Sequence, residues 1–359
     1  MRDLPKAHLH LHFTGSLRPA TLLDLADRHG IALPPTLLAD RPLHVDTTEA
    51  RGWFRFQRRY DLARSVVRTP ADVRRLVAEA AADDAAEGSG WLEIQVDPTG
   101  YARWLGGLVP TVECVLDAAR AASRDTGVGV GVVLAAGRTR HPLEAAALAR
   151  LAARHAGAGV VGFGLSGDER RGRAEEFAAA FRIARRAGLL AVPHGGELAG
   201  PASVAACLDV LGARRVGHGV RAVEDPALLD RLAAAGVVCE VCPGSNLALG
   251  VYREPAAVPL RRLRAAGVPV ALGADDPLLF GSRLVDQYAA AREVHGCDDR
   301  ELAGLAQDAI RGSAAPDDVR ARLRAGVDRW LATPPAPAAV PHGAPVTGGP
   351  PPGPARARG

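Results

Sequence analysis

Four short polar clusters lie far apart in this sequence, each at the end of an apolar run. They carry imidazoles and carboxylates, which are ligands for divalent metals and also serve in acid–base chemistry. Residues so widely separated can share one site only if the fold gathers several strand ends, as a barrel of parallel strands does. The clusters therefore predict a metal site at one end of such a barrel. They are His8-Leu9-His10-Leu11-His12, Pro193-His194-Gly195-Gly196-Glu197, Gly217-His218-Gly219 and Ala274-Asp275-Asp276-Pro277.

The first cluster carries the clearest metal signal. Because side chains alternate along a strand, His8, His10 and His12 would share one face. Barrel active sites lie at the carboxyl ends of the strands, which places His10 and His12 better than His8. Two imidazoles at i and i+2 form a common half-site for zinc. The alternative is a polar strand end whose histidines bond only to the backbone.

Each of the other clusters also has a purely structural explanation. Gly195-Gly196 would let the backbone turn so that His194 and Glu197 face one cavity, but a helix cap and a solvated charge would look the same. His218, between two glycines, could be a turn residue. Asp275-Asp276 before a proline could be the N-cap of a helix. The joint placement of all four clusters at strand ends favours a shared site.

The elements that would position these clusters repeat as strand then helix, eight times. This is the pattern of a (β/α)8 barrel, an α/β fold that typically needs ~250 residues. The expected strands are Ala7–Phe13, Trp91–Asp97, Gly127–Ala135, Val160–Leu165, Leu189–His194, Arg215–Val220, Val237–Cys242 and Val268–Ala274. The expected helices are Pro19–His29, Ala71–Glu87, Thr111–Arg124, Glu144–His155, Arg173–Ala187, Pro201–Leu211, Pro226–Ala235 and Pro255–Ala266.

Two regions fall outside this repeat. Residues 14–90 hold most of the excess length, so we expect a helical insertion after the first strand that caps the mouth of the barrel. Residues 334–359 carry nine prolines and no apolar periodicity, which indicates a disordered tail. The predicted organisation is a barrel domain over residues 1–332, followed by a Pro/Gly-rich tail over residues 333–359.

The composition is that of an ordinary globular protein, with 48% hydrophobic and 23% charged residues. The 44 basic residues are interspersed with 40 acidic ones, and there is no basic run with interleaved aromatics that would predict nucleic-acid binding. Five cysteines make no disulfide framework for a chain of 359 residues. The sequence shows neither an apolar signal region nor the ~18 consecutive apolar residues of a membrane span. We therefore expect a cytoplasmic protein with no nucleic-acid or membrane partner.

Taken in order, the clusters resemble the motifs of the adenosine deaminase family of metal-dependent amidohydrolases. The similarity runs from about residue 5 to residue 290, and the motifs are highly specific as a set. The matching segments are Pro5 to His12 (family P-K-x-E-L-H-x-H, with His8 at the glutamate), Phe163 to Glu169 (F-D-L-A-G-D-E), Pro193 to Glu197 (x-H-A-G-E), Arg215 to Gly219 (R-I-G-H-G), Cys242 to Asn246 (C-P-x-S-N) and Asp275 to Phe280 (D-D-P-x-x-F).

The resemblance implies hydrolytic deamination of adenosine, or of a close 6-aminopurine nucleoside, to inosine and ammonia. It also implies one zinc ion per chain, a carboxylic acid that protonates N1 of the purine and a histidine that steers the attacking hydroxide. Protonating N1 while hydroxide adds to C6 requires an acid that burial keeps protonated. The matching residues are His10, His12, His194 and Asp275 for the metal, Glu197 and His218 for catalysis, and Gly167 and Asp276 for contacts to the ring.

The sequence departs from the family pattern mainly on the side of the sugar. Thr14 occupies the position of an aspartate that contacts the sugar hydroxyl in adenosine deaminases. Gln95 stands at the arginine of the E-x-R pattern, Gly164 at the aspartate of F-D-L, and Ala274 precedes the aspartate pair. We expect deamination to survive while sugar recognition shifts. Thr14 would tolerate a larger, modified or phosphorylated 5′ substituent better than a carboxylate would.

Two further features bear on the metal. Binuclear amidohydrolases bridge two metals with a carboxylated lysine from mid-barrel, but Lys6 is the only lysine here and precedes the first strand, which predicts a mononuclear site. Cys239 and Cys242 have a spacing found in zinc sites, yet they lie in an apolar run and no H-x-E motif accompanies them, which disfavours a metal role.

Other functions remain as alternatives. Free adenine or a 5′-modified adenosine could replace adenosine as the substrate. H-x-H near the start of a barrel also occurs in metal-dependent phosphoesterases and nucleases, which usually need two metals or a basic phosphate site. An inactive nucleoside-binding barrel would be expected to lack Glu197 or a metal ligand, and the sequence retains them all.

Overall fold

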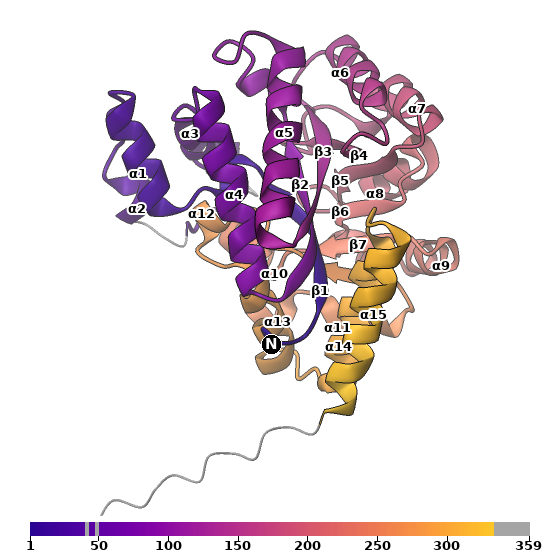
Figure 1. Ribbon diagram of the computed structural model, residues 1–359. Helices are drawn as coiled ribbons and strands as arrows, with labels where there is room; N and C mark the ends of the chain where they lie inside the picture. The colour runs from indigo at the N-terminus through magenta and orange to yellow at the C-terminus, as the bar shows by residue number, and fades with distance from the viewer. Residues whose placement is uncertain (40–42, 47–49, 334–359) are drawn as a thin grey trace, which may run out of the picture.

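The computed structural model of the protein describes residues 1–39, 43–46 and 50–333. Eight strands pair in parallel, each with the next along the chain. The first and last strands meet at a bridge between Leu11 and Asp275, where the Asp275 amide donates to the His10 carbonyl at 3.0 Å. The predicted (β/α)8 barrel is thereby confirmed, with a strand at each predicted run (Figure 1). The strands are β1 (Lys6–His12), β2 (Ser89–Val96), β3 (Gly129–Gly137), β4 (Val160–Ser166), β5 (Leu190–Gly195), β6 (Arg215–His218), β7 (Val238–Val241) and β8 (Val270–Leu272).

Helices surround the strands, and many of them begin at a proline, where the missing N–H costs no helical hydrogen bond. A capping box between Thr69 and Asp72 fixes the start of the helix before β2. The predicted helix Arg173–Ala187 is shorter than expected, because residues 174–177 form a 3-10 turn. The helices are α1 (Pro19–Arg28), α2 (Thr36–Ala39), α3 (Ala50–Arg64), α4 (Pro70–Ala86), α5 (Leu108–Thr126), α6 (Pro142–Arg154), α7 (Ala178–Arg186), α8 (Pro201–Ala206), α9 (Pro226–Ala235), α10 (Pro243–Ala248), α11 (Leu260–Ala265), α12 (Pro277–Phe280), α13 (Leu284–Glu293), α14 (Asp299–Gly312) and α15 (Asp317–Ala332).

The insertion after β1 is helical, as the sequence predicts. It begins with a 3-10 turn, η1 (Thr14–Ser16), and continues through α1, α2 and α3. α4 packs on β2 and α5 and so serves as a helix of the barrel itself. Figure 1 shows α1 and α3 beside α4, while α3 and α12 both contact η1. This arrangement places the insertion next to the carboxyl end of β1.

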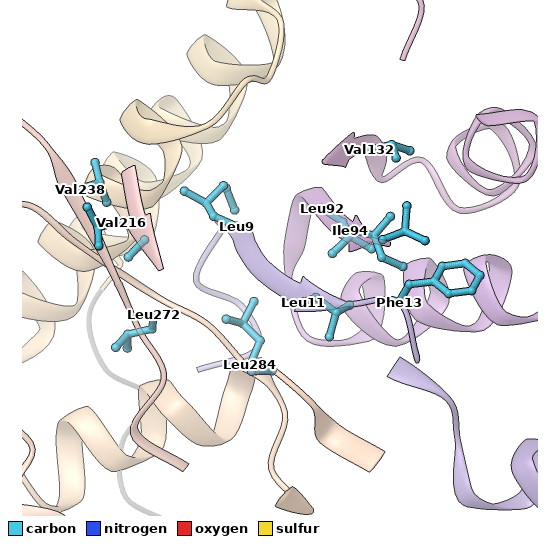
Figure 2. Close-up of a cluster of buried hydrophobic side chains, with 14 of the residues drawn as sticks. Leu9, Leu11, Phe13, Leu92, Ile94, Val132, Val216, Val238, Leu272 and Leu284 are labelled. Atoms are coloured by element: carbon cyan, nitrogen blue, oxygen red, sulfur yellow. The ribbon is translucent and has the colours of Figure 1, made fainter. Parts of the chain in front are cut away.

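Alternation along β1 divides its side chains between two environments. Leu9 and Leu11 are at most 2% exposed and lie among apolar side chains that include Leu284 of α13 (Figure 2). His10 and His12 point into the barrel, where they contact Glu240 and Asp275. The pairing of β1 with β2 shifts register between His8 and Leu11, and His8 contacts Asp84 of α4, so His8 does not share the face of His10 and His12, contrary to the prediction from the sequence. One short run of sequence thus supplies both packing against the helices and polar groups for the interior.

The carboxyl-terminal part of the described chain ends with α15. Leu323 and Val327 of this helix are buried, and α15 packs on α14 and β2. The predicted disordered tail lies, from residue 334 onward, outside the described residues. Within the described ranges, no helix combines the length and the apolar character needed to cross a bilayer.

Candidate active site

Four histidines and one aspartate converge at the carboxyl end of the barrel. His10 and His12 lie at the end of β1, His194 in β5, His218 at the end of β6, and Asp275 after β8. The centroid of the His10 ring lies 5.2 Å from that of His12, 4.7 Å from His194 and 4.9 Å from His218. The structure therefore brings together the residues that the sequence assigns to a metal site.

The ligand atoms in this cluster fit a bound divalent cation. The Nε2 atoms of His12 and His194 lie 3.2 Å apart, and Asp275 Oδ1 lies 3.2 Å from His12 Nε2 and 3.8 Å from His10 Nε2. His10 Nε2 is buried and has no hydrogen-bond partner among the described residues. A cation between these atoms would accept the lone pairs of the imidazole nitrogens and of the Asp275 carboxylate, which otherwise point toward one another without a shared partner.

The protonation state of His194 suits metal ligation. Burial, reinforced by the neighbouring imidazoles, holds the pKa of His194 well below its ordinary value, so the ring is neutral. Burial alone would lower the pKa of His12, but Asp276 and Asp275 outweigh it and raise that pKa to about 9. His10 donates its Nδ1–H to Glu240 Oε2 at 2.8 Å, which leaves the Nε2 lone pair facing the cluster. Burial alone would raise the pKa of Glu240, but Arg215 and His10 outweigh it and lower that pKa. Glu240 is therefore an anion behind a candidate ligand.

Behind Glu240 lies a buried ion network that sequence reasoning missed. Arg215 Nε donates to Glu240 Oε1 at 2.6 Å, and Arg215 Nη2 donates to Glu93. Glu93 also accepts from Trp91 Nε1 at 2.9 Å. Arg215, Glu93 and Glu240 are each at most 1% exposed, so the network links β2, β6 and β7 inside the barrel. The only trace of this network in the sequence is one charged residue, Glu93, Arg215 or Glu240, within each of three apolar strands.

Glu197 and His218 face each other beside the ligand cluster. Glu197 Oε1 lies 3.5 Å from His218 Nε2, and both side chains are buried. Burial, reinforced by the charge of Asp275, raises the pKa of Glu197 well above its ordinary value, which favours the protonated acid. Burial lowers the pKa of His218 to about 3, so this imidazole is neutral. The pair offers a carboxylic acid next to a neutral base.

The backbone at two of these residues adopts an unfavourable conformation. His218 has φ 65° and Asp275 has φ 61°, in the left-handed region that most side chains avoid. Such conformations cost on the order of 1–3 kcal/mol each and persist where the surrounding structure imposes them.

A Cβ on the neighbouring Gly217 would lie 2.9 Å from the His10 ring and 3.2 Å from His194. Gly217 therefore makes room for the imidazoles, which a simple turn would not require.

A cavity of about 470 Å³ opens beside the cluster. Gly167 and Asp276, which the sequence predicts to contact the substrate, both line it, together with Glu197 and His218. Burial raises the pKa of Asp276 well above its ordinary value. The wall contributed by α3 consists of Trp53, Phe54, Phe56, Gln57, Tyr60, Asp61 and Arg64. The predicted capping insertion thus borders the candidate site.

Thr14 is not among the residues that line this cavity. It is buried in η1, and its hydroxyl lies 2.5 Å from the hydroxyl of Tyr101. Tyr60 and Arg64 do line the cavity, with the Arg64 guanidinium 5.0 Å from the centroid of the Tyr60 ring. The substrate contact expected of Thr14 stays a prediction. The phenol of Tyr60 and the guanidinium of Arg64, both from α3, border the cavity near Thr14.

Two of the departures from the family pattern lie against each other. A Cβ on Gly164 would lie 3.2 Å from Gln95 Oε1. That amide oxygen is buried without a hydrogen-bond partner in the described chain, and Gln95 lines the cavity. An arginine at position 95 and an aspartate at position 164 would therefore be neighbours. The sequence thus departs from the family motifs at two positions that lie next to each other.

His8 lies outside the groups of possible metal ligands among the described residues, whereas His10 and His12 belong to them. Its Nδ1 donates to Asp84 at 2.9 Å, and its Nε2 accepts from the Ala274 amide at 3.1 Å. His8 thus connects β1 to α4 and to the segment after β8, which stabilises the closure of the barrel.

The lysine and the cysteine pair lie outside the ligand cluster. Lys6 is at the opposite end of β1, where its Nζ donates to the Glu87 carbonyl at 2.6 Å. Cys239 and Cys242 are buried, and Cys242 Sγ donates to the Glu240 carbonyl at 3.6 Å. Neither cysteine belongs to a group of metal-ligating atoms found in the described ranges.

Comparison with known protein sequences places this geometry in context. The family model described as adenosine deaminase matches residues 5–330. A Streptomyces virginiae protein with the provisional name adenosine/adenine deaminase is 65% identical over 91% of this chain and 97% of its own length. An adenine deaminase from Agrobacterium fabrum is 35% identical over 90% of this chain and 97% of its own.

Solved structures agree in fold. An adenine deaminase from Arthrobacter aurescens superimposes with a TM-score of 0.84 at 31% identity, covering 92% of this chain and 99% of its own. A zinc-bound amidohydrolase from Burkholderia ambifaria has a TM-score of 0.79 at 27% identity, covering 92% and 91%. Arabidopsis ADAL complexed with IMP has a TM-score of 0.80 at 25% identity, covering 91% and 97%.

Proposed function

The chain belongs to the adenosine deaminase family, and on that premise we propose that it catalyses the zinc-dependent hydrolytic deamination of adenosine, or of a close 6-aminopurine nucleoside, to inosine and ammonia. The observation that carries the proposal is the pair of Glu197 and His218, 3.5 Å apart beside side chains that fit a metal ion. An acid, a neutral base and a metal site at one cavity are what hydrolysis at C6 of a purine requires.

His10, His12, His194 and Asp275 would hold one zinc ion. Three imidazoles and a carboxylate are a donor set that zinc accepts. When bound, zinc lowers the pKa of a water molecule to about 7 and so supplies a nucleophile near neutral pH. Lys6 lies away from this cluster, so we expect a single ion per chain.

Glu197 would give its proton to N1 of the purine. Protonation of N1 makes C6 more electrophilic, so addition of hydroxide at C6 becomes easier when both occur in one step. His218 can accept a hydrogen bond, or a proton, from the attacking oxygen at Nε2. Collapse of the tetrahedral adduct then expels ammonia and leaves a 6-oxopurine.

Gly167 and Asp276 would contact the purine ring. Asp276 lines the cavity with a raised pKa, so it can hold a proton and donate it in a hydrogen bond to a ring nitrogen. Gly167 has φ 98° and no side chain, so the ring can approach its backbone closely.

The substituent on the purine is the open part of the proposal. Thr14 replaces a carboxylate, and Arg64 adds a cation to the cavity wall, so an anionic 5′ group would meet no repulsion from either. We therefore expect modified or phosphorylated 5′ positions to be tolerated. Free adenine is the second candidate, because relatives at 35% identity are named adenine deaminases. We expect the enzyme to act in the cytoplasm without a nucleic-acid or membrane partner.

The test is ammonia release by the zinc-loaded protein. The substrates would be adenosine, 2′-deoxyadenosine, adenine, adenosine phosphates and 5′-thio-modified adenosines. Glu197→Gln keeps the shape but removes the acid, and we expect kcat to fall by roughly 10³-fold while zinc content stays the same. No turnover of any 6-aminopurine by the wild type, with zinc bound, would refute the proposed function.

A further inference from the structure

We propose that Glu169 is a positioning residue for this reaction, because its carboxylate fixes the loop that carries Glu197. The inference rests on the proposed function in one respect, namely that Glu197 is the proton donor. Glu169 lies in the loop after β4 and is 7% exposed. It is absent from the residues that line the cavity, so it would act through Glu197 and not on the substrate.

Glu169 accepts hydrogen bonds from four consecutive backbone amides of the loop after β5. Its two carboxylate oxygens divide these donors, and a hydroxyl from the first turn of α8 adds a fifth. Oε1 accepts from the Gly196 amide at 2.6 Å and from Ser203 Oγ, while Oε2 accepts from the amides of Glu197 at 2.9 Å, Leu198 at 2.7 Å and Ala199 at 3.0 Å.

Successive amides that point toward one place form a concave anion-binding site. Here the anion is a side chain of the same protein, supplied by the loop after the neighbouring strand β4. Gly196 has φ 70°, the left-handed conformation that turns the backbone toward Glu169. Without the carboxylate, these amides would lose their partner in a largely buried loop, where unpaired N–H groups are costly. The conformation of residues 196–199 therefore depends on Glu169.

The backbone is also the main restraint on the Glu197 side chain. Glu197 Oε1 is buried and has no hydrogen-bond partner in the described chain, and His218 Nε2 lies 3.5 Å from it. A proton donor must hold its position relative to the substrate within a fraction of an ångström, since an error of about 1 Å can cost about 10²-fold in rate. Glu169 supplies that restraint from behind the loop.

The experiment compares Glu169→Gln with Glu169→Asp and with a matched control, Glu87→Gln. Glutamine keeps the size of Glu169 but presents an NH2 group to backbone donors, whereas aspartate keeps the charge with a shorter reach. Glu87 is likewise buried, and it accepts from the Val285 amide at 3.0 Å and from Arg283 far from the cavity. Hydrogen exchange of amides 196–199, kcat, KM, zinc content and Tm are measured for each protein.

We expect the amides at 196–199 to exchange about tenfold faster or more in Glu169→Gln, because charge-assisted hydrogen bonds are lost. kcat should fall about 10²-fold with KM within threefold and zinc content unchanged. Glu169→Asp should lie between this variant and the wild type, and it provides the test if Glu169→Gln does not fold. Glu87→Gln should lower Tm without changing kcat.

Unchanged exchange at 196–199, or a kcat equal to that of the wild type in both Glu169 variants, would overturn the inference. So would an equal loss of kcat in Glu87→Gln, since the effect would then follow general stability. The exchange measurement needs no substrate. If the wild type deaminates no purine but exchange accelerates in Glu169→Gln, the proposed function fails while the loop restraint stands.

Discussion

The two sides of the cavity differ in how they relate to the family pattern. On the metal side, every predicted ligand and both proposed catalytic groups are present, and they lie on strands of the barrel or shortly after them. Around the rest of the cavity, Gln95 lines the wall beside Gly164, at positions where the family motifs have an arginine and an aspartate, and α3 contributes aromatic rings and Arg64. The metal side is built from the ends of barrel strands. The rest of the cavity is built largely from the inserted helix α3 and from positions where the sequence departs from the family motifs.

The difference suggests a division of roles: the strand ends would carry out the reaction, and the α3 wall would select the substrate. The strand ends are held by the backbone ladder and by the buried ions behind them, so a change there would disturb several contacts at once. α3 contacts η1 beside the end of β1, so we expect that changes in the α3 wall would leave the proposed ligands in place. Substitutions on the metal side should therefore change zinc affinity, whereas substitutions on the other side should change substrate preference and leave zinc bound.

Among the variants that compare the two sides, the largest effect is expected from Glu240→Gln on the metal side. Glutamine still accepts from His10 Nδ1–H, but the charge that orients the ring and raises its basicity is lost. Loss of such a supporting contact typically weakens metal affinity by about 10–100-fold. Competition with a chelator measures the zinc Kd, and the same samples give Tm.

Glu93→Gln is the matched control for that measurement. Glu93 and Glu240 are both buried and both bond to Arg215, but only Glu240 contacts a proposed ligand. Both variants should lower Tm, because each leaves Arg215 with one carboxylate. Equal zinc affinities in the two variants would show that the ion network stabilises the barrel without tuning the metal site.

A smaller effect is expected from restoring the family residues at Gly164 and Gln95. Gly164→Asp alone places a carboxylate against the amide oxygen of Gln95, 3.2 Å from the new Cβ, and should lower the free energy of unfolding by about 1–3 kcal/mol. Adding Gln95→Arg should recover part of that loss. Urea unfolding of both single variants and the double variant gives the coupling energy, expected at about 0.5–3 kcal/mol.

Strictly additive free energies in this cycle would mean that the two replacements are independent. The KM values for the substrate panel provide a second readout, since Gln95 lines the cavity. We expect the double variant to change the ranking of substrates while retaining zinc, because neither residue lies among the ligands. Loss of zinc in the double variant would contradict the separation of the two sides.

The sequence predicted the metal side better than the rest, for physical reasons. Strand-end placement alone favoured His10 and His12 over His8, because barrel sites lie at the carboxyl ends of the strands. Alternation predicted one shared face for all three, but it could not foresee the register shift between His8 and Leu11 that leaves His8 against Asp84. The Arg215 network could not be foreseen, since a lone charge in an apolar strand does not name its partner on another strand. Thr14 aligned with a substrate contact, but the packing of Tyr101 against it required the three-dimensional structure.

Helix boundaries show the same limit on a local scale. Pro226–Ala235 was predicted to the residue, because an aspartate cap, a proline and a following glycine mark both ends. The segment Pro201–Leu211 instead changes from α8 to a π-type turn over residues 207–211. No local pattern distinguishes that change from a continuous helix.

The smallest effect is expected from removal of the carboxyl-terminal tail. The family match ends at residue 330, and α15 already covers β2 and α14 through buried Leu323 and Val327. Truncation after Leu331 should therefore leave kcat/KM within about twofold and Tm within a few degrees, as for changes away from the core. Truncation after Gly326 also removes Val327, and it should lower Tm clearly because buried apolar surface is lost. A large loss of turnover in the shorter deletion would mean that the tail packs on the barrel.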